Sequence, residues 1–201
     1  MQTETLKKIS LTRQLLTCAL LCILAVAVIF LFDRRPYIPW LLAGLPLLYQ
    51  IFFGVMIGAL YWAGSGMGYK YMAKRQGTQN VVESYGRLDL RGWNPLWISL
   101  AAGFGEELLF RGALQPLLGI WLTSVLFVLA HTRAYRFNKF NKRVLVQSLG
   151  IFGVSVAFGF LATYAGLATA MIVHVAVDVS GLYIIRRVIN ASPEAPATAT
   201  A

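Results

Sequence analysis

Long apolar runs, separated by short basic segments, constrain the fold of this chain more than any other feature of its sequence. Several runs approach or exceed about 18 residues, enough for a helix to cross a hydrocarbon layer roughly 30 Å thick. Only 13% of the 201 residues are charged and 58% are hydrophobic, whereas a soluble protein carries about 25% charged residues. We therefore expect an all-α, polytopic integral membrane protein.

The pattern predicts about six transmembrane helices and an interfacial segment in a single membrane domain spanning residues 1–190. The segment at 63–94 mixes aromatic with basic residues, which is typical of an interfacial position. The tail at 191–201 is rich in alanine, threonine and proline and is expected to be disordered. The expected helices are 15–32, 40–62, 95–115, 117–131, 144–164 and 167–185, the last closed by Arg186 and Arg187.

The distribution of positive charge predicts the orientation in the membrane. The net charge is +10, and the charged residues lie between the apolar runs rather than along one face of a domain. This favours anionic lipid over nucleic acid as the partner of the basic residues. With cytoplasmic N- and C-termini, 15 of the 18 Lys and Arg residues lie inside, as the positive-inside rule requires. A compact multi-pass chain of this kind suits a bacterial inner membrane.

The first apolar run has two features that could indicate a signal peptide or a cysteine site. The run is longer than the apolar part of a signal peptide and lacks a small-residue cleavage site, so it is expected to be retained as a span. Cys18 and Cys22 lie one helical turn apart within it. That spacing suits neither a disulfide framework nor a zinc site, so both are expected to act as apolar packing residues.

A small set of ionisable residues lies within the predicted spans. A charge at the centre of a membrane helix costs about 2.5–3.5 kcal/mol on insertion scales. Such groups are expected to face one another or a hydrated cavity and to mark a functional site. They are Glu106, Glu107 and Arg111 in the third span, His131 in the fourth, and His174 and Asp178 in the sixth.

Helical spacing predicts which of these side chains share a face. The pairs Glu107 and Arg111, Phe127 and His131, and His174 and Asp178 are each four residues apart. Residues at this spacing are neighbours on a helix surface. Glu106 lies about 100° around the helix from Glu107 and is expected to point elsewhere. Glu106 and Asp178 fall at compatible depths, so one cavity open to the cytoplasm could collect the set.

These motifs resemble those of the CPBP family of intramembrane proteases, also called Abi, which includes CAAX prenyl proteases and proteins of bacteriocin processing or immunity. Glu106-Glu107-Leu-Leu-Phe-Arg111 resembles its E-E-x-x-x-R motif, and Phe127-Val-Leu-Ala-His131 resembles F-x-x-x-H. His174-Val-Ala-Val-Asp178 resembles H-x-x-x-N/D. The resemblance covers a core at about 90–187.

The resemblance implies an endopeptidase that acts on a membrane-associated protein or peptide. It implies that Glu106, assisted by His131, activates a water for attack on the scissile carbonyl, and that His174 and Asp178 stabilise the oxyanion. Glu107, Arg111 and Phe127 are implied as supporting residues. The residues themselves suit this chemistry, because a carboxylate in a desolvated pocket can act as a base near neutral pH.

Asp178 leaves two versions of the chemistry open. An ionised aspartate would repel an oxyanion, so Asp178 either stays protonated or binds a cation. In the second case Glu106, His131, His174 and Asp178 could hold a divalent metal such as zinc. The absence of an H-E-x-x-H spacing favours catalysis without a cofactor.

Other interpretations use the same residues. Glu107 and Arg111 could be a helix-stabilising ion pair, Phe127 a packing residue, and Asp178 a partner of His174 without a catalytic role. The four cavity residues could also form the relay of a proton-coupled transporter, or remain in a non-catalytic immunity or scaffold protein. A serine–histidine pair of Ser155 and His174 is disfavoured because Val156 stands where a glycine is expected.

Overall fold

The computed structural model describes residues 8–33, 42–72, 84–132 and 142–191, together with positions 39 and 82. The described residues form α-helices and π-helical turns, and only isolated β-bridges join extended segments. Five helical stretches among them are long and apolar enough to cross a membrane. The all-α, polytopic class predicted from the sequence is confirmed.

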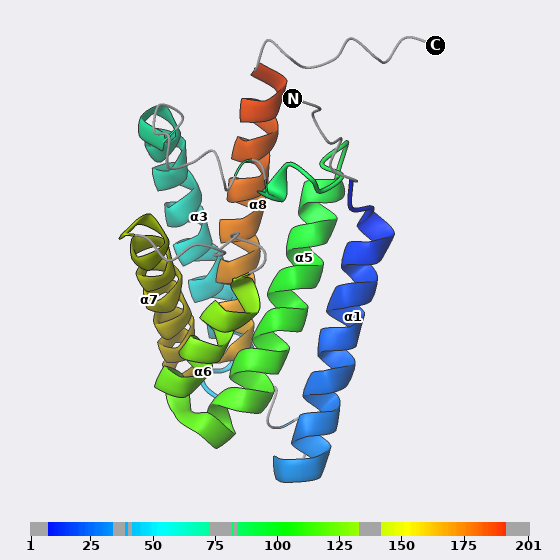
Figure 1. Ribbon diagram of the computed structural model, residues 1–201. Helices are drawn as coiled ribbons and strands as arrows, with labels where there is room; N and C mark the ends of the chain where they lie inside the picture. Colours follow the sequence, from blue (N-terminus) through cyan, green and yellow to red (C-terminus); the bar gives the residue numbers. More distant parts are fainter. Residues whose placement is uncertain are drawn as a thin grey trace.

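Helix α8 (Leu167–Ala191) lies at the centre of the bundle (Figure 1). It packs between α3 (Leu47–Met72) and α5 (Asn94–Glu107), and α1 (Leu11–Val28) lies on the far side of α5. In the apolar window of α8, 44% of the residues are buried, against 17% for α1, α3 and α7. The helix that carries His174 and Asp178 is therefore the one most enclosed by protein.

The longest apolar stretch, Asn94–His131, is folded back on itself. It comprises α5, the π-helical turn η3 (Leu108–Leu114) and α6 (Gln115–His131). The Phe110 and Phe127 ring centroids are 4.9 Å apart, whereas 17 residues of straight helix span about 25 Å. The reversal includes Gly119, whose φ of 74° is unfavourable for other residues. The two arms correspond to the third and fourth predicted spans.

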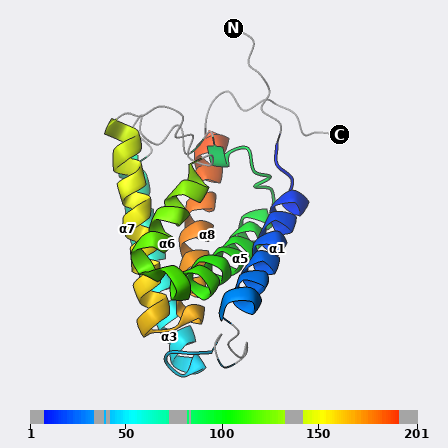
Figure 2. The ribbon, with the colours of Figure 1, turned by 60° about the horizontal axis from the view of Figure 1, so that its bottom comes forward.

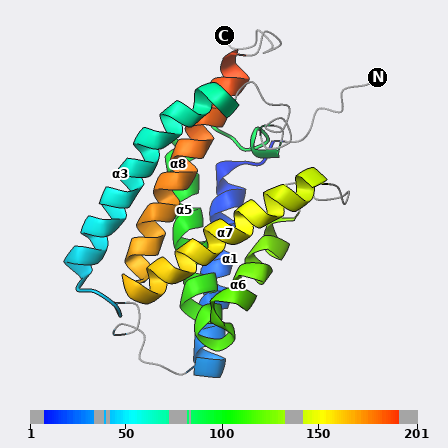
Figure 3. The ribbon, with the colours of Figure 1, turned by 90° about the vertical axis from the view of Figure 1, so that its left-hand side faces the viewer.

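Helix α7 (Lys142–Tyr164) packs against α6 and meets α8 near the turn that joins them. Toward its N-terminal end it diverges from α8, as Figures 2 and 3 show. A cavity lies in this wedge between the two helices. It extends inward from the end of the bundle where α1 begins. Residues of both helices line it.

Close packing of α3 on α8 depends on small residues. A Cβ at Gly54 would lie 2.9 Å from Cβ of Ile172, and one at Gly58 would lie 2.8 Å from Cβ of Ala176. Glycines four residues apart let two membrane helices approach closely, and van der Waals contact then holds them together. This contact holds α8 beside α3 for several turns.

Two helix ends differ from those predicted. The second predicted span ends at 62, but α3 continues to Met72 because its end still packs on α8, where Trp62 contacts Tyr183 and Ser65 hydrogen-bonds Ser180 at 2.5 Å. Residues 63–72 are thus helical rather than part of an interfacial segment. Positions 73–81 and 83 of that predicted segment, and 192–201 of the predicted tail, lie outside the described residues.

The last predicted helix also continues, through Arg186 and Arg187 to Ala191. Arg186 does not end the helix, because its Nη1 donates a hydrogen bond to the carbonyl oxygen of Gly92 at 2.9 Å. Ile189, one turn further on, packs against the cluster that includes Leu88 and Leu182. Contacts with the segment before α5 therefore stabilise the extra turn.

The segment before α5 is joined to the start of α1. Ile9 donates its backbone N–H to the Arg87 carbonyl at 2.7 Å, and Asp89 donates to the Ile9 carbonyl at 3.1 Å. Asp89 also accepts hydrogen bonds from the Arg91 guanidinium at 2.8 and 2.9 Å. That guanidinium lowers the pKa of Asp89 to about 2, so the pair is ionised at neutral pH. Ile9, Arg87 and Leu88 of this junction form part of the cavity wall at that end of the bundle.

Candidate active site

Two adjacent carboxylates at the end of α5 enter different surroundings. Glu107 is fully buried, whereas the Glu106 side chain is 19% exposed and lines the cavity. The difference follows from helix geometry, because consecutive side chains point about 100° apart. The π-helical turn η3 begins directly after Glu107, and such turns are frequent at functional sites.

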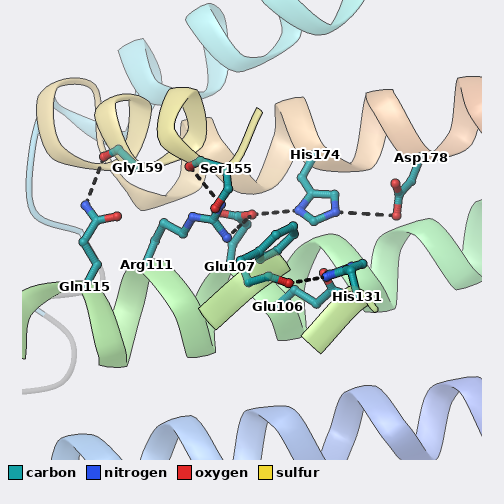
Figure 4. A network of polar contacts seen from close by, with 10 residues as sticks. Glu106, Glu107, Arg111, Gln115, His131, Ser155, Gly159, His174 and Asp178 are labelled. Atoms are coloured by element: carbon teal, nitrogen blue, oxygen red, sulfur yellow. Dashed lines mark hydrogen bonds and ion pairs between the residues drawn. The ribbon is translucent and has the colours of Figure 1, made fainter. Parts of the chain in front are cut away.

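The buried carboxylate, Glu107, joins three helices. Its Oε1 accepts a hydrogen bond from His174 Nδ1 at 2.7 Å and lies 3.3 Å from Arg111 Nη1 (Figure 4). Arg111 in turn donates from Nη2 to the Oγ and carbonyl oxygen of Ser155, at 2.9 and 3.1 Å. The network fixes α5, α7 and α8 relative to one another and orients the His174 ring.

The cavity-facing carboxylate, Glu106, lies opposite His131. Glu106 Oε2 is 3.5 Å from His131 Nε2, which is longer than a direct hydrogen bond. The Nδ1–H of His131 is donated to the Phe127 carbonyl at 2.8 Å. Since the carbonyl can only accept, Nδ1 carries the proton, and in the neutral ring Nε2, which faces Glu106, is an acceptor. A carboxylate and an imidazole acceptor therefore face each other across a gap at the cavity wall.

His174 faces the cavity with its second nitrogen. Its Nε2 lies 3.6 Å from Asp178 Oδ2, one turn along α8. The Phe158 ring stacks on the imidazole with centroids 5.1 Å apart and an interplanar angle of 10°. With Glu107 on Nδ1 and Phe158 on one face, the ring is held so that Nε2 points toward Asp178.

Aromatic rings separate the buried network from the cavity. Phe127 stacks on His131, with centroids 4.2 Å apart, and the Arg111 guanidinium lies 4.6 Å from the centroid of the same ring. The face shared by Phe127 and His131 was expected from their spacing. Phe127 also has a second contact, because its ring covers the buried guanidinium of Arg111.

All four candidate catalytic residues predicted from the sequence line one cavity of about 650 Å³. The predicted pairs at helical spacing are all in contact. The structure adds two partners that the sequence did not indicate, Ser155 for Arg111 and Phe158 for His174. The sequence disfavours Ser155 as a nucleophile, and in the structure its Oγ accepts a hydrogen bond from Arg111 within the buried network.

Among the described residues, no group of three or more His, Cys, Asp and Glu side chains is arranged to hold a metal ion. The two nitrogens of His174 face Glu107 and Asp178, and His131 Nδ1 faces a carbonyl. The donor atoms of Glu106, His131, His174 and Asp178 thus do not converge on one point. Cys18 and Cys22 are free thiols, as predicted, and Cys18 packs against Gly105.

Comparison with known proteins identifies a family for the part of the chain that carries the site. Residues 90–180 match the family model described as type II CAAX prenyl endopeptidase Rce1-like. No curated protein and no solved structure matches the chain. The matched residues include every candidate site residue, and the family resemblance stated from the motifs is confirmed. The match supports an intramembrane endopeptidase in general.

Proposed function

Because residues 90–180 belong to the Rce1-like family of type II CAAX prenyl endopeptidases, we propose that this chain is an intramembrane endopeptidase in which Glu106 and His131 activate a water. The proposal is supported mainly by one observation. Glu106 Oε2 and His131 Nε2 lie 3.5 Å apart at the wall of the cavity. A water that contacts both can donate a proton to Glu106 while His131 orients it.

In the proposed reaction, the oxygen of this water attacks the scissile carbonyl carbon as one of its protons passes to Glu106. The carbonyl oxygen becomes an oxyanion. Collapse of the tetrahedral intermediate breaks the C–N bond, and the proton on Glu106 passes to the leaving amine. General-base and general-acid assistance of this kind contributes about 10²–10⁴-fold in rate.

We propose that His174 and Asp178 stabilise the oxyanion. His174 donates Nδ1–H to Glu107 at 2.7 Å, so a carboxylate behind the ring stabilises a proton on Nε2, as in serine protease triads. Nε2 and a protonated Asp178 then present two donors to the same part of the cavity. A preorganised donor to an oxyanion is worth about 2.7–4 kcal/mol.

The substrate class that fits this site is a membrane-associated protein or peptide. The cavity lies within the span-forming part of the bundle and reaches the end where α1 begins, so a segment held at the membrane surface can reach Glu106. We also propose that this end faces the cytoplasm of a bacterial cell. Arg13, Arg91 and Arg186 lie near helix termini at that end, as the positive-inside rule favours.

The experiment that tests the function measures cleavage of a single-span reporter by purified protein in proteoliposomes. Glu106→Gln and His131→Ala are expected to lower the cleavage rate by about 10²-fold or more, because each removes a group that contacts the water. Asp89→Asn is the matched control, since its carboxylate lies outside the cavity and pairs with Arg91. Cleavage by Glu106→Gln at the rate of the unmodified protein would refute the proposal.

A further inference from the structure

A second hollow lies outside the candidate active site, between α3 and the C-terminal part of α8. The two helices run side by side to this end of the bundle (Figure 3). The hollow has a volume of about 310 Å³, and we call it the α3–α8 groove. The residues that line it include Trp62 and Ser65 of α3 and Tyr183, Arg186 and Arg187 of α8. None of these residues lines the candidate active-site cavity.

The α3–α8 groove is positively charged. Arg186 and Arg187 both line it, and none of the described residues in its wall is acidic. The hollow on the other side of Arg186 differs, because it contains Asp89, which is paired with Arg91 at 2.8 Å. Two guanidinium groups without a counter-charge in the same hollow favour an anionic ligand.

The Arg186 guanidinium is oriented by contacts on one side and has donors to spare on the other. Its Nη1 donates to the Gly92 carbonyl at 2.9 Å, and its carbon lies 4.4 Å from the centroid of the Tyr183 ring. Both hydrogen bonds that Arg186 makes to described residues come from Nη1. A guanidinium also has N–H donors at Nε and Nη2, which can bind an anion while Nη1 keeps its contacts. An oriented group of this kind lowers the entropic cost of binding.

The position of the groove along α8 places it at the level of the membrane surface. Arg186 follows Leu167, the first residue of α8, by 19 positions. That length of helix spans about 28 Å, close to the roughly 30 Å of the hydrocarbon layer. The Trp62 and Tyr183 rings lie beside the arginines with centroids 6.4 Å apart, and tryptophan and tyrosine are enriched at this level. The phosphate groups of lipids are therefore the anions nearest to the groove.

We propose that the α3–α8 groove binds the phosphate group of an anionic phospholipid, whose acyl chains lie against the exposed apolar surface of α3 at Val55 and Leu60. The inference does not depend on the proposed endopeptidase function. Basic pockets between transmembrane helices bind anionic head groups in this way. A zwitterionic lipid fits less well, because its cationic group would lie near two arginines.

The test measures lipid binding to the purified protein in a neutral detergent by native mass spectrometry. Phosphatidylglycerol and phosphatidylcholine with the same acyl chains are titrated separately, so that the probes differ only in the head group. Arg187→Gln removes one positive charge from the groove and leaves the Arg186 contact with Gly92 in place. Arg13→Gln is the matched control, because Arg13 is exposed near the start of α1 and does not line the groove.

We expect the unmodified protein to bind one molecule of phosphatidylglycerol at least about tenfold more tightly than phosphatidylcholine, as a charged hydrogen bond predicts. Arg187→Gln is expected to remove most of this preference and Arg13→Gln to leave it. Equal affinity for the two lipids would overturn the proposal. Equal weakening by the two substitutions would also overturn it, because it would show a diffuse attraction of lipid to a basic surface.

A second measurement locates the bound lipid. Phosphatidylglycerol with brominated acyl chains is expected to quench the fluorescence of Trp62, so the quenched fraction should fall in Trp62→Phe and in Arg187→Gln. The same quenched fraction in the unmodified protein and in Trp62→Phe would place the lipid elsewhere and overturn the proposal. Glycerol phosphate, which lacks acyl chains, should not displace the lipid even in large excess. Displacement would assign the groove to a soluble phosphate compound and would likewise overturn the proposal.

Discussion

At the scale of single residues, the adjacent carboxylates of α5, Glu106 and Glu107, have different roles. Glu107 is enclosed and holds His174 and Arg111 in place, whereas Glu106 meets the cavity and His131. A charge buried without its partner is far more costly than one that can reach water. Substitution of the two residues should therefore affect different properties of the protein.

Glu107→Gln is expected to destabilise the fold by about 3 kcal/mol or more, because it leaves the buried Arg111 guanidinium without its counter-charge. Glu106 is not paired with a buried arginine. The Glu106→Gln protein should therefore unfold at nearly the temperature of the unmodified protein. Thermal unfolding of both variants in detergent, followed by circular dichroism, checks the difference. Equal melting temperatures for the two variants would contradict the assignment.

Asp178→Asn is expected to retain cleavage activity within about tenfold, since an asparagine N–H can replace the protonated carboxyl as a donor to the oxyanion. A chelator should not change the rate of either protein. The measurement is the reporter cleavage rate with and without the chelator. Loss of activity in Asp178→Asn, together with chelator sensitivity of the unmodified protein, would instead support a metal held near Asp178.

The pairs at helical spacing could be predicted from the sequence, because they are set within one element. Glu107 and Arg111 are an example, at 3.3 Å. Contacts between helices could not be derived in this way. Glu107 and His174 are hydrogen-bonded although they lie 67 positions apart in the sequence, and Arg111 and Ser155 lie 44 positions apart. Those partners depend on how the helices are rotated against one another.

At the scale of elements, the contact of α3 with α8 sets the position of the helix that carries His174. It depends on the lack of side chains at Gly54 and Gly58. The sequence predicts that the second span ends at 62 and that an interfacial segment begins at 63. Packing on α8 outweighs the low helix propensity of glycine there, and α3 continues to Met72.

Gly58→Ala and Gly64→Ala are expected to act in opposite directions. A Cβ at Gly58 would lie 2.8 Å from Cβ of Ala176, whereas one at Gly64 would meet nothing within 4 Å. Overpacking costs about 1–3 kcal/mol, and an unobstructed Gly→Ala change in a helix gains up to about 1 kcal/mol. Unfolding midpoints of the two variants in a denaturing detergent titration check the signs, and stabilisation by Gly58→Ala would contradict the packing described here.

At the scale of the whole molecule, the bundle forms a wedge-shaped cavity whose wall includes the turn before α5 and residues of α7 and α8. The number and order of the apolar helices could be predicted from run length and charge. The course of the cavity could not, because it depends on the divergence of α7 from α8 (Figure 3). The folded-back stretch Asn94–His131 brings Glu106 and His131 to the same level of this cavity.

The start of α1 and the end of α8 lie at the same end of the bundle (Figure 1), and we expect both to face the cytoplasm. Arg13→Cys and Asn190→Cys, each in a protein lacking Cys18 and Cys22, should react with a membrane-impermeant maleimide in inverted vesicles and not in intact cells. Both positions are exposed, so access is decided by the side of the membrane. Labelling of either cysteine in intact cells would reverse the orientation.

The proposed mechanism requires that Glu106 and His131 share a water within the protein at membrane depth. A high-resolution structure of the unmodified protein in a lipid nanodisc would reveal this water. We expect an ordered water within about 3.2 Å of both the Glu106 carboxylate and His131 Nε2. A carboxylate turned away from the cavity, or hydrogen-bonded directly to His131 with no water in contact, would contradict it.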